Sequence, residues 1–431
     1  IFLSHFAFRF VALVGIGILM RNSSIAHLLL FILLCYLFFI LLQPSSKTSV
    51  LSINKRWIIY NGFCIRPYLH AGSDVTIRLL NNLSDPNDFH LTSIPRDDPQ
   101  AFEDDLTVLT HSSASALDEV YLSKLLANWR GPISLAVSLH GSFNEKYVRQ
   151  KIEATLRLLH NENDASRFAV HILLKRNREN TCEESELQLQ EVKRPSKKDI
   201  FYATYPINTV RNVARLFSSS RYIAFADSDY LFSSGFYEKI LAILRGYVPV
   251  GSTNALLYRI FEVEEKDSRS RNHQMTKEDL RALIAVNKAR VFHEKHWPQG
   301  HTVPRLTGWL TAPESERPGL FDLNISLKHR PFWEFQFTGL RDIPLFDENF
   351  PYRVDNNLEL RWEVCRAGYR LLPIEDLFVY HTLSKDDKGK DSNKRKDAIK
   401  RKNYGRTVKV KKALKERMDE FYPNTKSECP E

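Results

Sequence analysis

Apolar and polar positions change their spacing at about residue 101, and from there predicted strands alternate with predicted helices. Short apolar runs predict four buried strands, at residues 106–110, 133–137, 168–174 and 222–226. Helical spacing predicts a helix between successive strands, at residues 117–129, 147–159 and 210–217. Apolar strands that alternate with helices are typical of a parallel sheet covered on both faces. We therefore expect one α/β domain at 101–424 with a central, mostly parallel sheet.

The amino-terminal part of the chain is apolar in a different way. Residues 25–42 contain no Asp, Glu, Lys or Arg, and this 18-residue stretch has the threshold length for a helix that crosses a bilayer. No small-residue cleavage site follows it cleanly, so we expect a transmembrane signal anchor and not a cleaved signal peptide. Residues 43–100 are rich in Ser, Asn, Asp and Pro and are expected to form a stem that leads into the luminal region.

Residues 1–24 would then be a cytoplasmic leader. The chain begins with Ile, and Met20 opens a short polar segment, so we expect Met20 to be the natural start and residues 1–19 an upstream extension. The basic residues that flank the anchor favour the opposite orientation under the positive-inside rule. Two N-glycosylation triplets, at Asn82 and Asn324, favour a luminal domain.

Composition narrows the class of protein. The 431 residues are 43% apolar and 26% charged, which is ordinary for a globular protein. The net charge of +10 suits anionic partners and is concentrated at residues 385–415, a run that is also typical of a solvated helix. Tyr404 is the one aromatic residue in that run, and no nucleic-acid motif occurs, so we expect no nucleic-acid partner.

Five cysteines are scattered without a CxxC pair, which argues against a zinc site. Cys35 lies in the predicted anchor. The other four allow up to two disulfides if the domain is luminal, and their pairing is open from the sequence.

Two carboxylates, Asp227 and Asp229, directly follow the fourth predicted strand. Open α/β sheets bind ligands at the carboxyl ends of their strands. Two close carboxylates repel each other, and a hard divalent cation removes that repulsion by binding their oxygens. Mn²⁺ or Mg²⁺ keeps positions for diphosphate oxygens and stabilises charge on a leaving diphosphate. The pair therefore indicates a metal-bound nucleotide diphosphate; the alternative is a strand-ending turn with solvated aspartates.

Two further segments carry polar side chains that suit such a site. Residues 376–381 form a short apolar strand that ends in His381, which is either a neutral imidazole ligand of the metal or a surface histidine. Pro206 precedes a helical run. In that run Asn208, Arg211 and Asn212 are candidates for contact with phosphate or sugar, and their alternative role is to brace the helix against the sheet.

Taken in order, these segments make residues 104–423 similar to glycosyltransferase family 49, which includes β-1,4-glucuronyltransferases and LARGE-type glucuronyltransferase domains. The matching motifs are LTVLTHSS at 106–113, WRGPISLA at 129–136, YPINTVRNVA at 205–214, DSD at 227–229, FWEF at 332–335, FDENF at 346–350, AGY at 367–369 and FVYH at 378–381.

The resemblance implies a GT-A type fold, which is a single Rossmann-like catalytic domain, and an inverting enzyme that uses a UDP-sugar with Mn²⁺ (or Mg²⁺). It also implies a single-pass type II Golgi membrane protein that acts in the lumen on a glycan or glycoprotein acceptor. Asp227 and Asp229 would bind the nucleotide and metal and His381 the metal, and the segment Thr110, His111 and Ser112 would lie near the nucleotide. A homodimer is compatible with the sequence, which leaves the oligomeric state open.

An inverting transfer needs a general base for the acceptor hydroxyl. Asp347 and Glu348 are the first candidates and Glu334 the second; an acidic pair is also typical of a helix cap. The chain departs from the family at residues 352–356, where a glycine is lost, and at residues 333–335, which read Trp-Glu-Phe in place of Trp-Glu-Pro. Both changes fall near the expected acceptor site, so they leave the donor sugar and the acceptor open.

We therefore expect a metal-dependent inverting glycosyltransferase that moves a sugar, with glucuronic acid as the first choice, from a UDP-sugar to a glycan. Xylose or an N-acetylhexosamine is the alternative donor sugar. A non-catalytic, lectin-like relative is the alternative outside enzymes, and the presence of Asp227, Asp229 and His381 argues against it.

Overall fold

The computed structural model describes eleven segments of the chain, at residues 50–52, 58–60, 63–69, 76–78, 103–139, 145–157, 167–175, 205–264, 274–321, 327–383 and 390–430. The predicted leader and anchor, both glycosylation triplets and Cys182 lie outside them. Within these segments, none of the helices combines the length and the apolar character that a membrane span requires.

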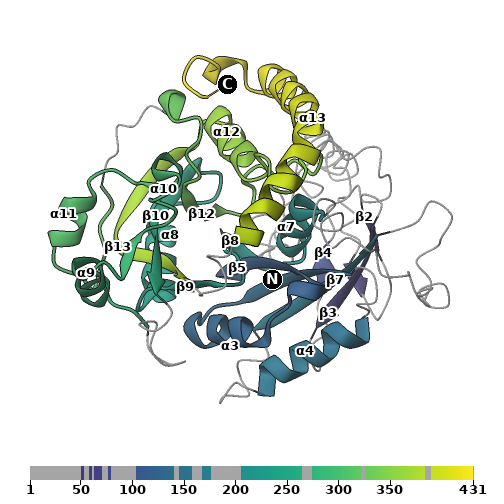
Figure 1. The fold of residues 1–431 in the computed structure, drawn as a ribbon, viewed down its shortest axis with the longest axis horizontal. Coiled ribbons are helices and arrows are strands. Elements are labelled where there is room, and N and C mark those ends of the chain that lie inside the picture. The colour runs from purple at the N-terminus through teal and green to yellow at the C-terminus, as the bar shows by residue number, and fades with distance from the viewer. Residues whose placement is uncertain are drawn as a thin grey trace, which may run out of the picture. The chain divides into compact units, whose positions relative to one another are not determined.

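Most strands belong to one eleven-stranded mixed sheet (Figure 1). Its strands along the chain are β2 (Ile58–Tyr60), β3 (Phe63–Leu69), β5 (Glu103–Ser113), β6 (Ile133–Leu139), β7 (Phe168–Lys175), β8 (Ser220–Phe225), β9 (Tyr230–Phe232), β10 (Asn254–Glu264), β11 (Ala289–Val291), β12 (Gln336–Leu340) and β13 (Arg370–Leu383). The order across the sheet is β2-β3-β7-β6-β5-β8-β12-β10-β13-β9, and β11 pairs with β10. A separate two-stranded sheet joins β1 (Val50–Ser52) to β4 (Thr76–Arg78).

The four predicted strands are confirmed as β5, β6, β7 and β8, and they form a parallel block. The expectation of a mostly parallel sheet is wrong for the sheet as a whole, because six of its ten described strand pairings are antiparallel. An apolar run reports that a strand is buried on both faces, but it does not fix the direction of the neighbouring strand. β12, for instance, enters between β8 and β10 and runs opposite to both.

Helices cover both faces of the parallel block. The described α-helices are α3 (Glu119–Asn128), α4 (Glu145–Arg157), α7 (Ile207–Leu216), α8 (Phe236–Tyr247), α9 (Lys277–Ala285), α10 (Pro298–His301), α11 (Leu306–Thr311), α12 (Leu358–Arg366) and α13 (Lys390–Phe421). Three short 3-10 helices are η2 (Ala114–Ala116), η4 (Leu327–His329) and η6 (Pro423–Thr425). The helices expected at 117–129, 147–159 and 210–217 correspond to α3, α4 and α7.

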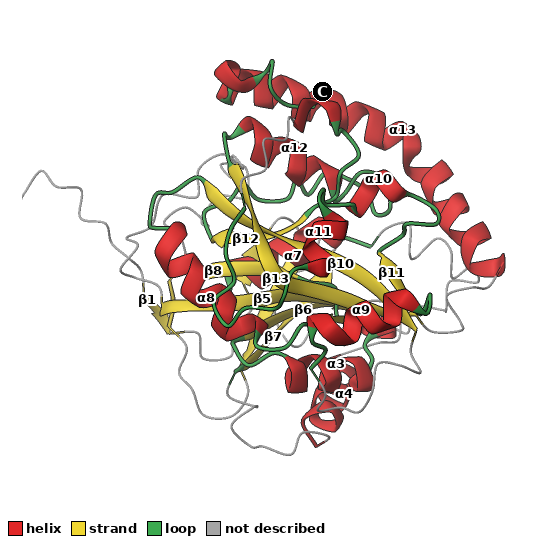
Figure 2. Ribbon diagram, turned by 90° about the vertical axis from the view of Figure 1, so that its left-hand side faces the viewer, coloured by secondary structure: helices red, strands yellow, loops and turns green. Residues whose placement is uncertain are grey.

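Alternation along β5 divides the core. Leu106 and Val108 pack with α3, α4 and α8, whereas Leu109 packs with α7 on the other face. In Figure 1, α3 and α4 lie below these strands and α7 lies above them. Figure 2 shows α12 and α13 at the opposite end from α3 and α4. Because side chains alternate between the faces of a strand, one apolar run fills both layers.

Local sequence signals explain several element boundaries. Asp118 caps α3 by accepting hydrogen bonds from the backbone of Val120 and Tyr121. Thr276 and Asp279 form a capping box at the start of α9. Gly131 lies where an added Cβ would stand 2.3 Å from the ring of Tyr237, so a larger residue does not fit before β6 without displacement.

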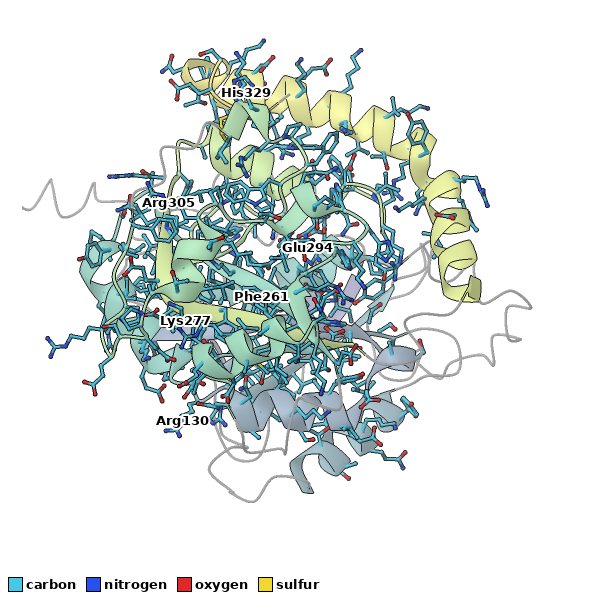
Figure 3. All side chains as sticks on the ribbon, turned by 60° about the vertical axis from the view of Figure 1, so that its left-hand side comes forward. Arg130, Phe261, Lys277, Glu294, Arg305 and His329 are labelled. Carbon is cyan, nitrogen blue, oxygen red and sulfur yellow. A yellow bond between two sulfur atoms is a disulfide. The ribbon has the colours of Figure 1, made fainter. Side chains whose placement is uncertain are left out.

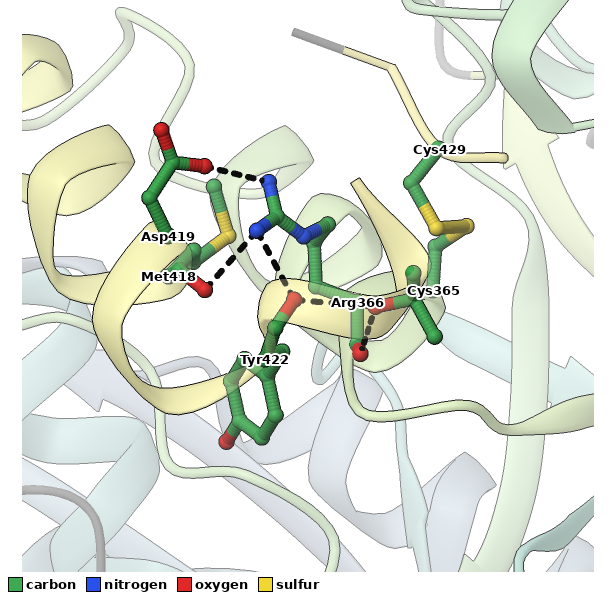
Figure 4. The surroundings of a disulfide bond; sticks show 7 residues. Cys365, Arg366, Met418, Asp419, Tyr422 and Cys429 are labelled. Atoms are coloured by element: carbon green, nitrogen blue, oxygen red, sulfur yellow. Dashed lines mark hydrogen bonds and ion pairs between the residues drawn. A yellow bond between two sulfur atoms is a disulfide. The ribbon is translucent and has the colours of Figure 1, made fainter. Parts of the chain in front are cut away.

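A buried ion pair and a disulfide fix the outer segments. Lys277 of α9 lies 2.5 Å from Asp376 of β13, and both side chains are almost fully buried. In Figure 3, Lys277 and Phe261 lie among packed side chains, whereas Arg130 projects outward. Cys365 of α12 is bonded to Cys429, which follows α13 (Figure 4).

Candidate active site

The two aspartates of the DSD motif leave the sheet at the carboxyl end of β8. The side chains of Asp227 and Asp229 are 49% and 35% exposed, so both remain open to solvent. Nε2 of His381 lies 2.8 Å from Oδ2 of Asp229. The sheet makes this contact possible, because His381 of β13 is paired in register with Tyr230 at the start of β9. Asp227, Asp229 and His381, which were predicted separately, therefore lie together.

His111 also lies beside Asp227. Parallel pairing of β5 with β8 brings the strand ends together, and Nε2 of His111 stands 3.4 Å from Oδ1 of Asp227. Nδ1 of His111 lies 3.0 Å from the hydroxyl of Tyr205. Burial raises the pKa of Tyr205, so its phenol stays protonated and donates to Nδ1. The ring hydrogen of neutral His111 is then on Nε2, which faces the carboxylate.

The charges at this edge favour an ionised Asp227. Desolvation acts to raise the pKa of Asp227, but the contact with His111 and the charge of Arg211 act against it, and the pKa lies below its usual value. Burial lowers the pKa of His111, so the ring is neutral over the physiological range. An ionised carboxylate beside a neutral imidazole suits a bound cation.

The remaining predicted residues of β5 have buried side chains. Thr110 is 1% exposed, and Ser112 is buried and donates to the backbone oxygen of Ser113. Of the three residues expected near the nucleotide, His111 is the one whose side chain contacts the aspartate motif.

The polar residues of α7 hold the loop that contains the acidic pair. The amide of Asn208 donates to the backbone oxygen of Asp347, and the amide of Asn212 donates to Glu348. Both asparagines are buried, so their side chains brace this loop. Arg211 is half-buried, donates to the backbone of Asn356 and lies close enough to lower the pKa of Asp227 through its charge.

The acidic pair itself is engaged by protein groups. Asp347 is buried and lies 2.9 Å from Arg417 of α13, which also contacts Glu363 at 2.7 Å. Glu348 accepts hydrogen bonds from the hydroxyl of Thr209 and the amide of Asn212. The carboxyl groups of both residues therefore already have donors.

Glu334 is placed differently from the acidic pair. Its side chain is 18% exposed, accepts a hydrogen bond from Asn357 at 3.1 Å and lies 3.9 Å from Nε2 of His301. Burial raises the pKa of Glu334, and the charges of Arg361 and Arg211 oppose this effect in part. The charge of Asp227 raises the pKa further, so Glu334 belongs to the same electrostatic neighbourhood as the aspartate motif.

The donors at this edge fit a divalent cation chemically. Asp227 and Asp229 offer carboxylate oxygens, and His381 offers an imidazole nitrogen that already meets Asp229. In the described part of the chain, no three or more His, Cys, Asp or Glu side chains are already grouped closely enough to hold a metal ion. A cation would thus take the place of the direct contact between His381 and Asp229.

Sequence reasoning did not single out several residues of this site. Tyr205 orients His111. Asn357 donates a hydrogen bond to Glu334, the charge of Arg361 lowers the pKa of Glu334, and His301 lies beside Glu334. Tyr205 lies in a motif that had been noted, so its polar ring was a usable signal. His301 had none, because only the fold brings it to Glu334.

Known proteins resemble the chain over most of its length. The zebrafish (Danio rerio) protein "Beta-1,4-glucuronyltransferase 1" is 25% identical over 361 residues, which cover 80% of this chain and 79% of that protein. The mouse (Mus musculus) protein of the same name is 26% identical over 75% of this chain and 78% of its own length. A crystal structure of Staphylococcus aureus TarS, residues 1–349, aligns with a TM-score of 0.34 and 14% identity over 64% of this chain and 60% of that one.

The family described as "Glycosyl-transferase for dystroglycan" matches residues 105–423. This range contains all of the parallel block except the first two residues of β5, and it contains the DSD motif, His381 and Glu334. It nearly coincides with the similarity to glycosyltransferase family 49 found in the sequence. The match covers well over half of the chain, so the protein belongs to this family and is a glycosyltransferase.

Proposed function

We propose that this glycosyltransferase is metal-dependent and inverting, has the GT-A architecture, and moves a sugar from a UDP-sugar to a glycan acceptor. The observation that carries the proposal is the meeting of Asp229 and His381 beside Asp227 at the carboxyl edge of β8. Glucuronic acid is the first choice of sugar, because the curated relatives at 25–26% identity are named β-1,4-glucuronyltransferases.

The residues of the site suggest a division of labour. Asp227, Asp229 and His381 would hold Mn²⁺ or Mg²⁺, which supplies Lewis-acid stabilisation of charge on a leaving diphosphate. His111 and Tyr205 keep Asp227 oriented and ionised. Asp227 is then free of its proton at neutral pH, as a carboxylate ligand of a hard cation must be.

Arg211 adds a fixed positive charge at the same edge. Its guanidinium donates to the backbone oxygen of Asn356 and lies 4.8 Å from the ring centroid of Phe346, so these two contacts hold it in place. A preorganised cation stabilises negative charge that develops during the transfer without reorganising at that moment. We expect the charge of Arg211 to stabilise the negative charge that develops on the departing UDP.

We place Glu334 ahead of Asp347 and Glu348 as general base. A base needs an accessible carboxylate with a pKa moved toward the working pH. Glu334 has a partly exposed side chain and a raised pKa. Asp347, in contrast, is buried against Arg417. In the transfer, Glu334 would take the proton of the acceptor hydroxyl as that oxygen bonds to the anomeric carbon, opposite the departing UDP.

A luminal, type II arrangement in the Golgi is part of the proposal. The disulfide between Cys365 and Cys429 supports it, because structural disulfides persist in oxidising compartments such as the secretory lumen. The apolar stretch 25–42 is the proposed anchor and lies outside the described residues.

The test is a donor screen with the intact chain, scoring UDP release with and without Mn²⁺. UDP-glucuronic acid should give the fastest release, and chelation should abolish it. Asp229→Asn should lower release by about a hundredfold or more, because the change removes a ligand charge. The exposed Asp397, on α13, supplies the matched control Asp397→Asn, which should behave as wild type.

A second readout separates binding from catalysis. Mn²⁺ should raise the unfolding temperature of the wild type and not that of Asp229→Asn, since a ligand stabilises only the form that binds it. Fastest release with UDP-xylose or a UDP-N-acetylhexosamine would replace the donor sugar and keep the mechanism. Release from no UDP-sugar, with Asp229→Asn unchanged in every assay, would leave a lectin-like relative.

A further inference from the structure

His301 is a buried histidine beside the proposed general base. It is the last residue of α10, and its side chain is 2% exposed. Nδ1 of its ring lies 3.1 Å from the backbone oxygen of Glu334, and Nε2 lies 3.9 Å from Oε2 of the same residue. The backbone nitrogen of Glu334 donates to the oxygen of Gly300 at 2.7 Å. The two segments are thus held together at both backbone and ring.

These contacts fix the tautomer of His301. A carbonyl oxygen only accepts, so Nδ1 carries the hydrogen and Nε2 of the neutral ring keeps its lone pair. Burial lowers the pKa of His301 to about 3, and the charges of His293 and Arg361 act in the same direction. Nε2 is buried and has no hydrogen-bond partner among the described residues. A buried acceptor of this kind requires an explanation.

The other groups that face Glu334 favour its ionised form. Asn357 donates to it from the start of α12, and the charges of Arg361 on α12 and Arg211 on α7 lower its pKa. The charge of Asp227, after β8, raises the pKa of Glu334. Tyr230 of β9 lies close enough that the charge of Glu334 adds to the effect of burial in raising the pKa of its hydroxyl. His301 differs from the asparagine and the arginines, because its free lone pair can accept a hydrogen bond from a protonated carboxyl group.

We propose that His301 is a positioning residue that accepts a hydrogen bond from Glu334 once Glu334 has taken the proton of the acceptor hydroxyl. The inference rests on the proposed function, in which Glu334 is the base. It explains why the orphaned nitrogen points at that carboxyl group. It also explains why the ring is buried and neutral, since a charged imidazolium would have no lone pair to offer.

The proton and electron pairs balance in the transfer. The acceptor oxygen forms its bond to the anomeric carbon, while the bond from that carbon to the diphosphate oxygen breaks and its electron pair leaves with UDP. The acceptor proton moves to Glu334, and a small rotation of the carboxyl brings its O–H from 3.9 Å to hydrogen-bond distance of Nε2. The proton then leaves to water across the exposed part of Glu334.

The informative variant is His301→Asn. The amide nitrogen of asparagine overlies Nδ1, so it keeps the bond to the backbone of Glu334 and removes Nε2. With the intact chain, UDP-glucuronic acid and Mn²⁺, kcat should fall about tenfold while KM for the donor is unchanged. The acid limb of the pH profile of kcat/KM should move to lower pH, because protonated Glu334 has lost its acceptor. His296→Asn, which changes an exposed histidine just before α10, is the control and should match wild type.

Two further variants make the outcomes distinct. His301→Gln, whose amide oxygen can accept near the position of Nε2, should recover part of kcat and also serves if the asparagine variant does not fold. An unmoved acid limb in both His301 variants, with activity falling only in step with the unfolding temperature, would reduce His301 to a packing role and overturn the inference. Full activity of Glu334→Gln would instead remove Glu334 as base, whatever His301 does.

Discussion

The disulfide between Cys365 and Cys429 permits a quantitative prediction. The two residues are 64 positions apart and both are buried, and the bond ties the turn after α13 to the end of α12 (Figure 4). Closing a loop of this length in the unfolded chain is worth about 4 kcal/mol of stability. The free energy of unfolding of the double variant Cys365→Ala/Cys429→Ala should therefore be lower by about 4 kcal/mol. Alanine is chosen over serine because serine would place a hydroxyl group in the buried site.

The native structure should survive this change. Arg366 still donates to the backbone oxygens of Met418 and Tyr422 and pairs with Asp419, so α13 should remain packed against α12. We expect UDP release without urea to be unchanged and the loss to appear in the midpoint of urea unfolding. Ser427→Ala, an exposed change on the same turn, is the control. A loss below about 1 kcal/mol would refute the loop-closure reasoning, and so would a loss of activity in the absence of urea.

Three other predictions concern buried groups. Arg417→Ala leaves two buried carboxylates without their cation and should cost about 3 kcal/mol in urea unfolding; an unchanged midpoint would contradict it. Gly131→Ala forces a Cβ against the ring of Tyr237 and should cost about 1–3 kcal/mol in the same measurement. Burial holds the pKa of His171 at about 3 in the folded protein, whereas the unfolded chain has the ordinary pKa of 6.5. Between these two pH values, only the unfolded chain carries a proton on this ring. Stability is then full above pH 6.5 and falls by about 2 kcal/mol at pH 5, and His171→Gln should remove that part of the fall.

The chemistry of the site was predictable in kind. Two aspartates after a buried strand and a histidine at the end of another indicated one sheet edge, and the fold brings Asp229 and His381 within 2.8 Å. The phosphate or sugar contacts expected for Asn208 and Asn212 stay predictions. The observed bonds of Asn212 go to the loop at 346–348, and the amide of Asn208 donates to that loop and to Glu359 of α12. Which partner a polar side chain finds depends on segments more than a hundred residues away, and a local pattern carries no record of them.

The ranking of the candidate bases shows the same limit. In the sequence, Asp347 and Glu348 are two adjacent acids in a family motif, and nothing near them announces Arg417. The packing of α13 supplies that arginine and pairs it with Asp347. Glu334 lies in an ordinary aromatic stretch, yet the fold surrounds it with Arg361, Asn357 and His301.

The sequence by itself determined the parallel block β7-β6-β5-β8, the family and the reaction class, because these depend on local apolar spacing and on ordered motifs. Only the tertiary structure decided the antiparallel remainder of the sheet, the pairing of Cys365 with Cys429 and the approach of His301 to Glu334. The physical reason is distance along the chain. The spacing of apolar residues, which indicates helices and buried strands, can be read from about a dozen consecutive residues. The direction of a strand, the partner of a cysteine and the pKa of a buried group depend on contacts between distant segments.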